Sequence, residues 1–312
     1  MIVVTGASGY VGSHIVKRLV EMGRPVRALV RSRAWVEQEG RLQGLPIEWA
    51  QSDVTRRETL DTAMHGATAV IHTVAIAIEK GGRRYEPIIY QGTVNVVEAA
   101  RAAGVRRFVN QCQLGADSTL PYRFLASKGQ AQDYVAASGL DWTAFRPAVI
   151  WGPEDEFANT FARLAPLSPL IFPIVGDGRA RFQPVWIEDV VTCIVKSLDD
   201  RATIGQEYEL GGPEVVTLEE IERRTLRAIG ARRLMVRFPI PVLRVIVTLM
   251  ESLLPAPPVT RSLLELLLVR NVTAANAIGR FVTEPRPFTP ENTELYMRRF
   301  RVVNTISQYL GR

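Results

Sequence analysis

The first dozen residues of the chain constrain its fold more than any other stretch. Residues 2–4 form an apolar run typical of a buried strand, and glycines follow at positions 6, 9 and 12. Residues 13–22 then predict a helix, because their apolar residues lie on one face and Gly23 can end it. The chain therefore opens with a strand, a glycine-rich turn and a helix.

Each glycine of this turn has a distinct expected role. Gly6 allows a tight turn, Gly9 lets the backbone approach a pyrophosphate, and Gly12 lets the helix pack close to the strand. Free amides and the helix dipole then favour an anion at the helix N-terminus. A glycine-rich turn without a ligand is the alternative, but the preceding strand and following helix favour a dinucleotide site. Its expected contacts are Gly6, Ser8, Gly9, Tyr10, Val11 and Gly12.

Strands and helices are predicted to alternate through the first half of the chain. The patterns predict strands at 25–30, 46–50, 69–73, 107–111 and 142–146, and helices at 57–64, 90–103 and 124–138. Repeated βα units of this length predict an α/β fold, a Rossmann-type doubly wound parallel sheet. Right-handed crossovers would place the carboxyl ends of the strands at one edge, where ligands bind.

This alternation ends near residue 152, where proline becomes frequent. We therefore expect a dinucleotide-binding domain at 1–150, to which 182–203 returns. Residues 151–181 and 204–312 are expected to form a smaller, mostly helical C-terminal substrate subdomain. Within it, Thr217 and Glu220 have the spacing of a capping box and predict a helix that runs to Ile229.

Composition excludes several classes of function. An apolar content of 47% with 22% charged residues is typical of a globular protein. The net charge of +6 comes mostly from scattered arginines, which indicate a solvated surface or, alternatively, anionic ligands or an acidic membrane surface. The absence of a basic block with interleaved aromatics argues against nucleic-acid binding. Two cysteines and three histidines form no metal-ligand motif, so we expect no metal and a reducing, cytoplasmic location.

The end of the second predicted strand indicates which cofactor is bound. Arg31, Ser32 and Arg33 follow it, and two guanidiniums with a hydroxyl suit a 2′-phosphate. We therefore expect NADP(H) in preference to NAD(H), although a solvated arginine pair is the alternative. Residues after the next two strands are expected to pass the adenine, the ribose and the phosphates, namely Asp53, Val54, Thr73, Val74 and Ala75.

Several motifs together resemble those of the extended and atypical short-chain dehydrogenase/reductase superfamily. They lie at 5–12, 53–54, 92–96, 146–149 and 151–153. Residues 138–147 and 254–260 resemble more specifically the branch that includes the dinucleotide-binding accessory subunit of respiratory complex I and its bacterial relatives. The resemblance implies a nicotinamide dinucleotide as ligand, with Pro147, Ala148 and Val149 among its contacts.

The reaction of that superfamily needs a tyrosine four residues before a lysine on one helix. Lys128 matches the lysine, which would also hold the ribose, but Phe124 occupies the tyrosine position and has no proton to give. Tyr122 stands six residues before Lys128, about 600° around a continuous helix, and could substitute only if the helix begins after it. A surface lysine is the alternative for Lys128.

A second expected group is missing as well. The superfamily places a serine or threonine after the fifth strand, where this chain has Cys112, expected to be a buried apolar thiol. We therefore predict a nucleotide-binding protein with weak or no reductase activity of the superfamily's usual kind. The alternative is an active NADPH-dependent oxidoreductase on a small carbonyl or quinone-like substrate, using Lys128 with Tyr122 or water.

Other polar and aromatic residues have both a functional and a structural interpretation. Asp189 is expected to cap a helix rather than to take part in chemistry. Four residues are candidate walls of a substrate cleft, with packing in the core as the alternative: Asn159, Phe182, Gln183 and Trp186.

The segment 238–270 is unusually apolar. Residues 242–254 predict a helix with one polar stripe, made by Arg244, Thr248 and Glu251, and 262–269 is similar. Such a segment could pack on the domain, lie on a membrane surface or bind a membrane-complex partner. Its charged residues argue against a membrane span, so we expect a cytoplasmic protein, with peripheral membrane attachment as the alternative.

Overall fold

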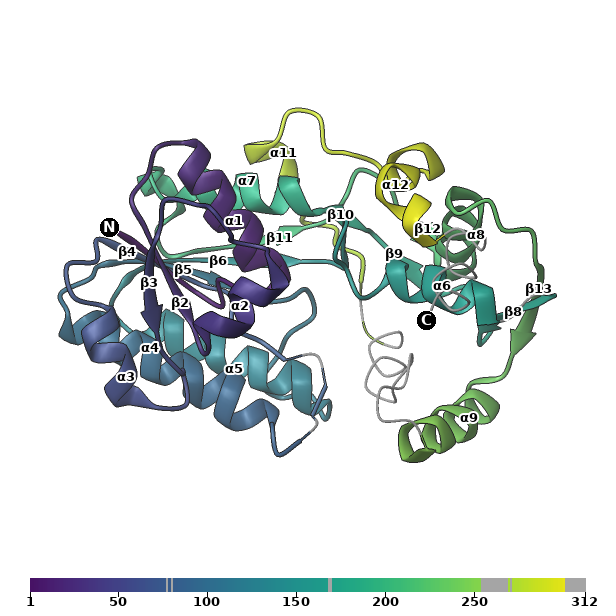
Figure 1. The fold of residues 1–312 in the computed structure, drawn as a ribbon, viewed down its shortest axis with the longest axis horizontal. Helices are drawn as coiled ribbons and strands as arrows, with labels where there is room; N and C mark the ends of the chain where they lie inside the picture. Colours follow the sequence, from purple (N-terminus) through teal and green to yellow (C-terminus); the bar gives the residue numbers. More distant parts are fainter. Residues whose placement is uncertain (77, 80, 168–169, 254–268, 270, 301–312) are drawn as a thin grey trace. The chain divides into compact units, whose positions relative to one another are not determined.

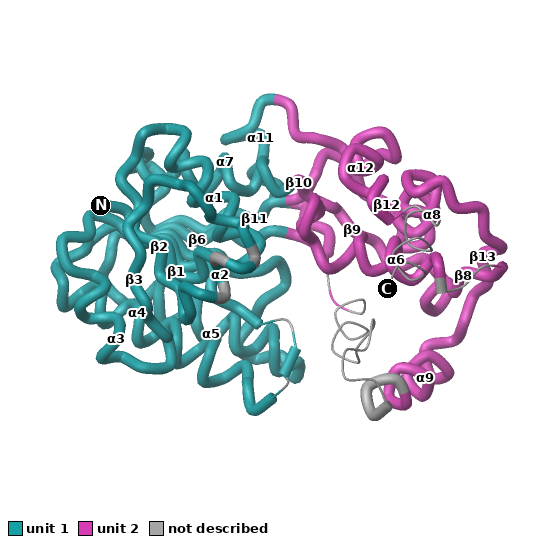
Figure 2. The backbone as a smooth tube through the Cα atoms, in the orientation of Figure 1, with its two compact units in different colours: residues 1–147, 187–210, 275–283 teal, residues 148–186, 211–274, 284–312 magenta. Residues whose placement is uncertain are grey.

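The computed structural model describes the 312-residue chain except residues 77, 80, 168–169, 254–268, 270 and 301–312 (Figure 1). The chain divides into two compact units (Figure 2). Unit 1 comprises 1–147, 187–210 and 275–283, and unit 2 comprises 148–186, 211–274 and 284–312.

Unit 1 is built on a seven-stranded parallel sheet in the order β11-β6-β5-β4-β1-β2-β3. This confirms the predicted doubly wound architecture. The strand order reverses at β1, the position where sheets of this class bind ligands beyond the carboxyl ends of their strands. The strands are β1 (Ile2–Thr5), β2 (Val26–Val30), β3 (Glu48–Gln51), β4 (Ala69–His72), β5 (Arg107–Gln111), β6 (Asp141–Pro147) and β11 (Gln206–Leu210).

Helices cover both faces of this sheet (Figure 1). On one face α1 (Tyr10–Glu21) packs on α7 (Ile187–Ser197), which also contacts α11 (Ile278–Phe281). On the other face α4 (Gln91–Ala102), preceded by the π-helical turn η1 (Glu86–Tyr90), packs between α3 (Arg57–Ala63) and α5 (Arg123–Ala137). A further helix, α2 (Arg33–Glu39), follows β2. The core beneath α3 and α4 is apolar and includes Val3, Leu60, Val70, Val97 and Phe108.

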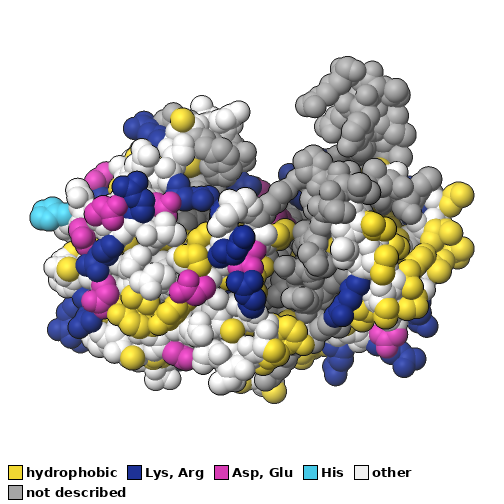
Figure 3. Space-filling model, turned by 90° about the horizontal axis from the view of Figure 1, so that it is seen from below, with side chains coloured by type: hydrophobic (Ala, Val, Ile, Leu, Met, Phe, Trp, Pro, Cys, Tyr) yellow, Lys and Arg dark blue, Asp and Glu magenta, His cyan; other side chains and the backbone are white. Residues whose placement is uncertain are grey.

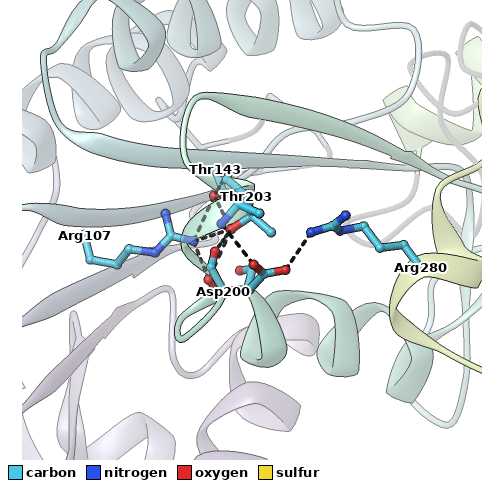
Figure 4. A network of polar contacts seen from close by, with 7 residues as sticks. Arg107, Thr143, Asp200, Thr203 and Arg280 are labelled. Atoms are coloured by element: carbon cyan, nitrogen blue, oxygen red, sulfur yellow. Dashed lines mark hydrogen bonds and ion pairs between the residues drawn. The ribbon is translucent and has the colours of Figure 1, made fainter.

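Polar contacts from β5 bind the returning segment to the sheet (Figure 4). The Arg107 guanidinium donates hydrogen bonds to the Ser197 carbonyl at 2.6 Å, the Thr203 hydroxyl at 3.0 Å and the Thr143 hydroxyl at 2.8 Å. Residues 204–210, expected in the smaller subdomain, belong to unit 1, because β11 pairs with β6 along its whole length. Residues 182–186, expected to return, belong to unit 2, because they form β-pairs there.

Unit 2 surrounds an aromatic core with helices and three two-stranded sheets. The core includes Trp151, Phe161, Phe172, Phe182 and Phe288. Thr217 caps α8 as predicted, since its hydroxyl accepts a hydrogen bond from the Glu220 amide at 3.2 Å. The helices are α6 (Ala158–Leu164), α8 (Leu218–Ala228), α9 (Ile240–Leu253) and α12 (Pro290–Met297). The strand pairs are β7 (Ile150–Trp151) with β10 (Val185–Trp186), β9 (Arg181–Phe182) with β12 (Val216–Thr217), and β8 (Ile171–Val175) with β13 (Leu234–Phe238).

The predicted apolar helix begins two residues earlier than expected, at Ile240, and ends at Leu253. The motif at 254–260 and nearly all of the predicted apolar piece at 262–269 lie outside the described residues.

Candidate nucleotide-binding site

The glycine-rich turn between β1 and α1 is closely packed against backbone. Gly6 has a φ of +71°, which L-residues with a side chain rarely adopt. A Cβ added at Gly12 would lie 2.1 Å from the Gly6 carbonyl oxygen, far closer than the van der Waals contact distance of carbon and oxygen. The helix begins at Tyr10, three residues before the expected start, so Gly12 lies in its first turn and lets that turn approach the loop. These contacts explain why glycine occupies both positions.

A cavity of about 560 Å³ opens beside this turn at the carboxyl ends of β1, β2 and β4. Its volume lies in the usual range for a small-molecule site. The residues that line it come from unit 1 alone and belong to four loops. Nine of the predicted cofactor contacts are among them, namely Gly6, Ser8, Gly9, Arg31, Asp53, Val54, Thr73, Val74 and Ala75.

The remaining predicted contacts lie elsewhere in unit 1 or belong to unit 2. Arg33 begins α2, and its guanidinium lies over the Trp49 ring, 5.8 Å from the ring centre. Ala148 and Val149 belong to unit 2. Six more unit 1 residues do not line the cavity: Tyr10, Val11, Gly12, Ser32, Lys128 and Pro147.

An arginine pair that the sequence analysis did not single out also lines the cavity. Arg83 and Arg84 follow Gly81 and Gly82 in the loop between β4 and α4. Partial burial and the positive charge of Arg31 lower the pKa of Arg83, whereas Asp53 raises it. Arg31 and Arg83 therefore lie close enough for their charges to interact. The only sequence signal was a Gly-Gly-Arg-Arg run after the fourth strand.

Beneath the cavity, a buried histidine joins β1, β4 and α4. The Thr93 hydroxyl donates to the Ile89 carbonyl at 2.6 Å, so it accepts the Nε2–H of His72 at 3.0 Å. The other ring nitrogen, Nδ1, then accepts the Thr5 hydroxyl at 2.7 Å. Burial, with a smaller effect from the charge of Lys128, lowers the pKa of His72 to about 3. His72 is therefore a neutral structural bridge.

Lys128 is buried rather than a surface lysine. Its ammonium donates a hydrogen bond to the Gln111 carbonyl at 3.1 Å, and burial lowers its pKa. The Cys112 thiol, buried as expected, donates to the Lys128 carbonyl at 3.7 Å, and burial raises its pKa. The pair therefore joins β5 to α5 and places a cationic group at the carboxyl end of β5.

The two aromatic residues before Lys128 do not reach the cavity. Phe124 packs edge-on against Tyr85, with ring centres 5.4 Å apart, in an apolar cluster with Ile76 and Ile89. Tyr122 is the N-cap residue of α5, so the helix does begin after it, as a substitute proton donor would require. Among the described residues that line the cavity, however, none is a tyrosine.

The other candidate residues have structural contacts. Asp189 is the third residue of α7 and lies in its first turn, not at the cap. In unit 2 the Asn159 amide donates to the Pro153 carbonyl at 3.0 Å, and the Gln183 amide donates to the Gly212 carbonyl at 2.9 Å. Phe182 is buried in the core, and the Trp186 ring lies 4.4 Å from the Trp151 ring. The core-packing interpretation therefore fits these four unit 2 residues.

The described residues contain neither a candidate metal site nor a membrane-spanning helix. No group of three or more histidine, cysteine, aspartate or glutamate side chains there could hold a metal ion. None of the helices found there is long and apolar enough to span a membrane.

Comparison with known proteins identifies related sequences. A family model described as NAD(P)H-binding matches residues 6–162. The mitochondrial NADH dehydrogenase [ubiquinone] 1 alpha subcomplex subunit 9 of Arabidopsis thaliana is 28% identical over 246 residues, covering 77% of this chain and 60% of the plant protein. The 3 beta-hydroxysteroid dehydrogenase/Delta 5-->4-isomerase of Mycobacterium tuberculosis is 27% identical over 281 residues, covering 79% of this chain and 74% of the relative.

The fold is shared with solved structures. The NADPH-dependent quinone oxidoreductase of Escherichia coli, complexed with NADPH, superposes with a TM-score of 0.70 over 95% of this chain and 99% of its own. Only 20% of the residues are identical, so this likeness concerns the fold alone.

Proposed function

The chain belongs to the NAD(P)H-binding family, within the short-chain dehydrogenase/reductase superfamily, and from this premise we propose that it prefers NADP(H) to NAD(H). We propose further that it has weak or no reductase activity of the superfamily's usual kind. The nucleotide would occupy the cavity of unit 1, with its pyrophosphate at the glycine-rich turn and its adenosine beyond the carboxyl ends of β2 and β3. Lys128 would hold the ribose. When bound, the cofactor supplies hydride chemistry.

The pairing of Arg31 with Arg83 at one cavity wall carries the proposed preference. A 2′-phosphate brings about two negative charges, and guanidiniums bind it through paired hydrogen bonds. Asp53 lies nearby, but its carboxylate already accepts hydrogen bonds from the Thr55 amide and hydroxyl, at 2.9 and 2.8 Å. We therefore expect the attraction of two guanidiniums for the 2′-phosphate to exceed the repulsion by one hydrogen-bonded carboxylate.

Calorimetric titration with NADP+ and NAD+ tests this preference. Arg31→Ala and Arg83→Ala are each expected to weaken NADP+ binding by about 10- to 100-fold, the range for one charge-assisted contact, with little effect on NAD+. Arg57→Ala is the matched control, because Arg57 pairs with Asp61 on α3 and does not line the cavity. An equal loss of affinity for both nucleotides would show that these arginines do not bind the 2′-phosphate.

The proposed lack of turnover rests on the position of Phe124. It occupies the proton donor's place before Lys128, and its ring packs against Tyr85. Cys112, in place of the hydroxyl residue, is buried and bonded to backbone. We expect NADPH oxidation with simple ketones and quinones to stay at background in an absorbance assay.

An active oxidoreductase is the second candidate function. The mycobacterial relative is named as a dehydrogenase, and burial lowers the pKa of Lys128, which lies at the carboxyl end of β5. Tyr122 or water would then supply the proton to a small carbonyl or quinone-like substrate. Rapid NADPH oxidation that is abolished by Lys128→Ala would favour this candidate and overturn the non-catalytic proposal. Retention of that activity in Tyr122→Phe would identify water as the donor.

We propose further that the chain associates with a membrane. The plant relative is named as a subunit of NADH dehydrogenase, which favours association of this chain with a membrane complex or membrane surface through 238–270. Within that segment, 254–268 and 270 lie outside the described residues. We propose a cytoplasmic protein with peripheral attachment.

A further inference from the structure

Helix α9 presents an apolar stripe to solvent. Val242, Val245, Ile246 and Leu249 are 46%, 61%, 41% and 55% exposed, and they follow the i, i+3, i+4, i+7 spacing of one helix face. The opposite side is anchored, because Leu243 and Val247 belong to the buried core of unit 2. The buried residues of α9 therefore fix the orientation of its exposed stripe.

The strand pair β8–β13 of the same unit also exposes apolar side chains. Leu170, Ile171 and Leu234 are 79%, 43% and 66% exposed. Figure 3 shows hydrophobic side chains gathered at the end of the molecule that holds β8 and β13, with charged side chains beside them that are mostly lysine and arginine. Seven large apolar side chains exposed on one unit indicate an interaction surface.

The charges beside this surface are mostly positive. Residues 231–253 contain four arginines and one acidic residue, Glu251 on α9. Three of the four side chains are exposed, those of Arg232, Arg237 and Arg244, although Arg237 also pairs with Glu219 at 3.1 Å. Arginines that flank an exposed apolar helix complement the negative surface potential of anionic lipids.

The length of α9 favours a helix that lies on a bilayer over one that spans it. Its 14 residues extend about 21 Å, shorter than the roughly 30 Å hydrocarbon core. We propose that α9 lies in the plane of an anionic phospholipid bilayer, with its stripe Val242, Val245, Ile246 and Leu249 among the acyl chains and the nearby arginines at the headgroups. This inference rests on and deepens the proposed peripheral attachment, and it does not depend on nucleotide binding.

Vesicle cosedimentation of the full chain tests the inference. Vesicles of phosphatidylcholine with about one third phosphatidylglycerol should bind the protein more tightly than phosphatidylcholine alone, and high salt should weaken binding. Leu249→Glu should reduce the bound fraction at least about tenfold, since it places a charge among acyl chains. Arg244→Glu should reduce it by several-fold, because one attractive charge becomes repulsive.

Leu295→Glu is the matched control, because Leu295 is a 70% exposed leucine on α12 of the same unit. It should bind vesicles as the unaltered chain does. Circular dichroism and NADP+ titration verify that each variant is folded. If the unaltered chain fails to bind NADP+, that result contradicts the proposed nucleotide site in unit 1 and leaves the vesicle experiment as the test of α9. Equal binding to both vesicle types, no binding to either, or full binding by Leu249→Glu would overturn the inference. Self-association without lipid binding, abolished by Leu249→Glu, would identify a second copy as the occupant and also overturn it.

Discussion

The buried carboxyl of Glu222 should make the stability of unit 2 depend on pH. Glu222 lies on α8, is fully buried, and burial raises its pKa from 4.5 to about 8. In the folded protein it is therefore protonated at pH 7, whereas in the unfolded chain it is ionised. Ionisation of Glu222 in the unfolded chain lowers the free energy of unfolding by about 1.4 kcal/mol for each pH unit above 4.5, or by about 3 kcal/mol at pH 7. The full stability is therefore present below pH 4.5, and this part of it is lost as the pH rises towards 8.

Replacement by the neutral Glu222→Gln removes this dependence. The variant should be more stable than the unaltered chain at pH 7, by about 2–3 kcal/mol, because glutamine has no ionised form that favours unfolding. At about pH 5 the two proteins should differ little. In calorimetry, the gain should raise the Tm of the transition of unit 2 by several degrees at pH 7.

The control for Glu222→Gln is Glu156→Gln, which changes an exposed carboxyl of the same unit. It should leave the Tm unchanged across this pH range. An equal Tm shift for Glu222→Gln at pH 5 and pH 7, or a loss of stability at pH 7, would refute the reasoning. Either result would mean that Glu222 is ionised in the folded protein or stabilised by contacts that glutamine cannot replace.

Two further predictions concern unit 1. Gly12→Ala should lower the free energy of unfolding by about 1–3 kcal/mol and weaken NADP+ binding in calorimetric titration, because the added Cβ would lie 2.1 Å from the Gly6 carbonyl oxygen. Gly279→Ala is the control and should have neither effect, because an added Cβ there would meet nothing within 4 Å. Burial lowers the pKa of His72 to about 3, so stability should be lost as the pH falls from 6.5 towards 3, and denaturation profiles of His72→Gln should show a smaller loss. Equal acid sensitivity in both proteins would contradict a neutral His72.

Much of unit 1 was predictable because its signals are local. The glycine spacing, the apolar runs and the stop at Gly23 act within one turn or one strand, so β2, α3, β5 and α5 lie within two residues of their expected positions. Nine cofactor contacts were predictable for the same reason, since the carboxyl ends of parallel strands meet at one edge. Helix α1 begins at Tyr10, three residues before its predicted start, because Gly12 permits close packing from within the first turn of the helix.

Other features depend on contacts between residues distant in the sequence. Arg83, rather than Arg33, joins Arg31 at the cavity, because the loop after β4 folds back to the end of β2, while Arg33 lies over Trp49. The return of 204–210 follows from pairing with β6, which local patterns do not record. The sequence by itself determined the alternation of strands and helices along unit 1 and the glycine-rich turn, because backbone conformation is a local property. Only the tertiary structure decided which arginines share the cavity, that Lys128 is buried, and which face of α9 meets solvent, because burial depends on what the rest of the chain places beside a residue.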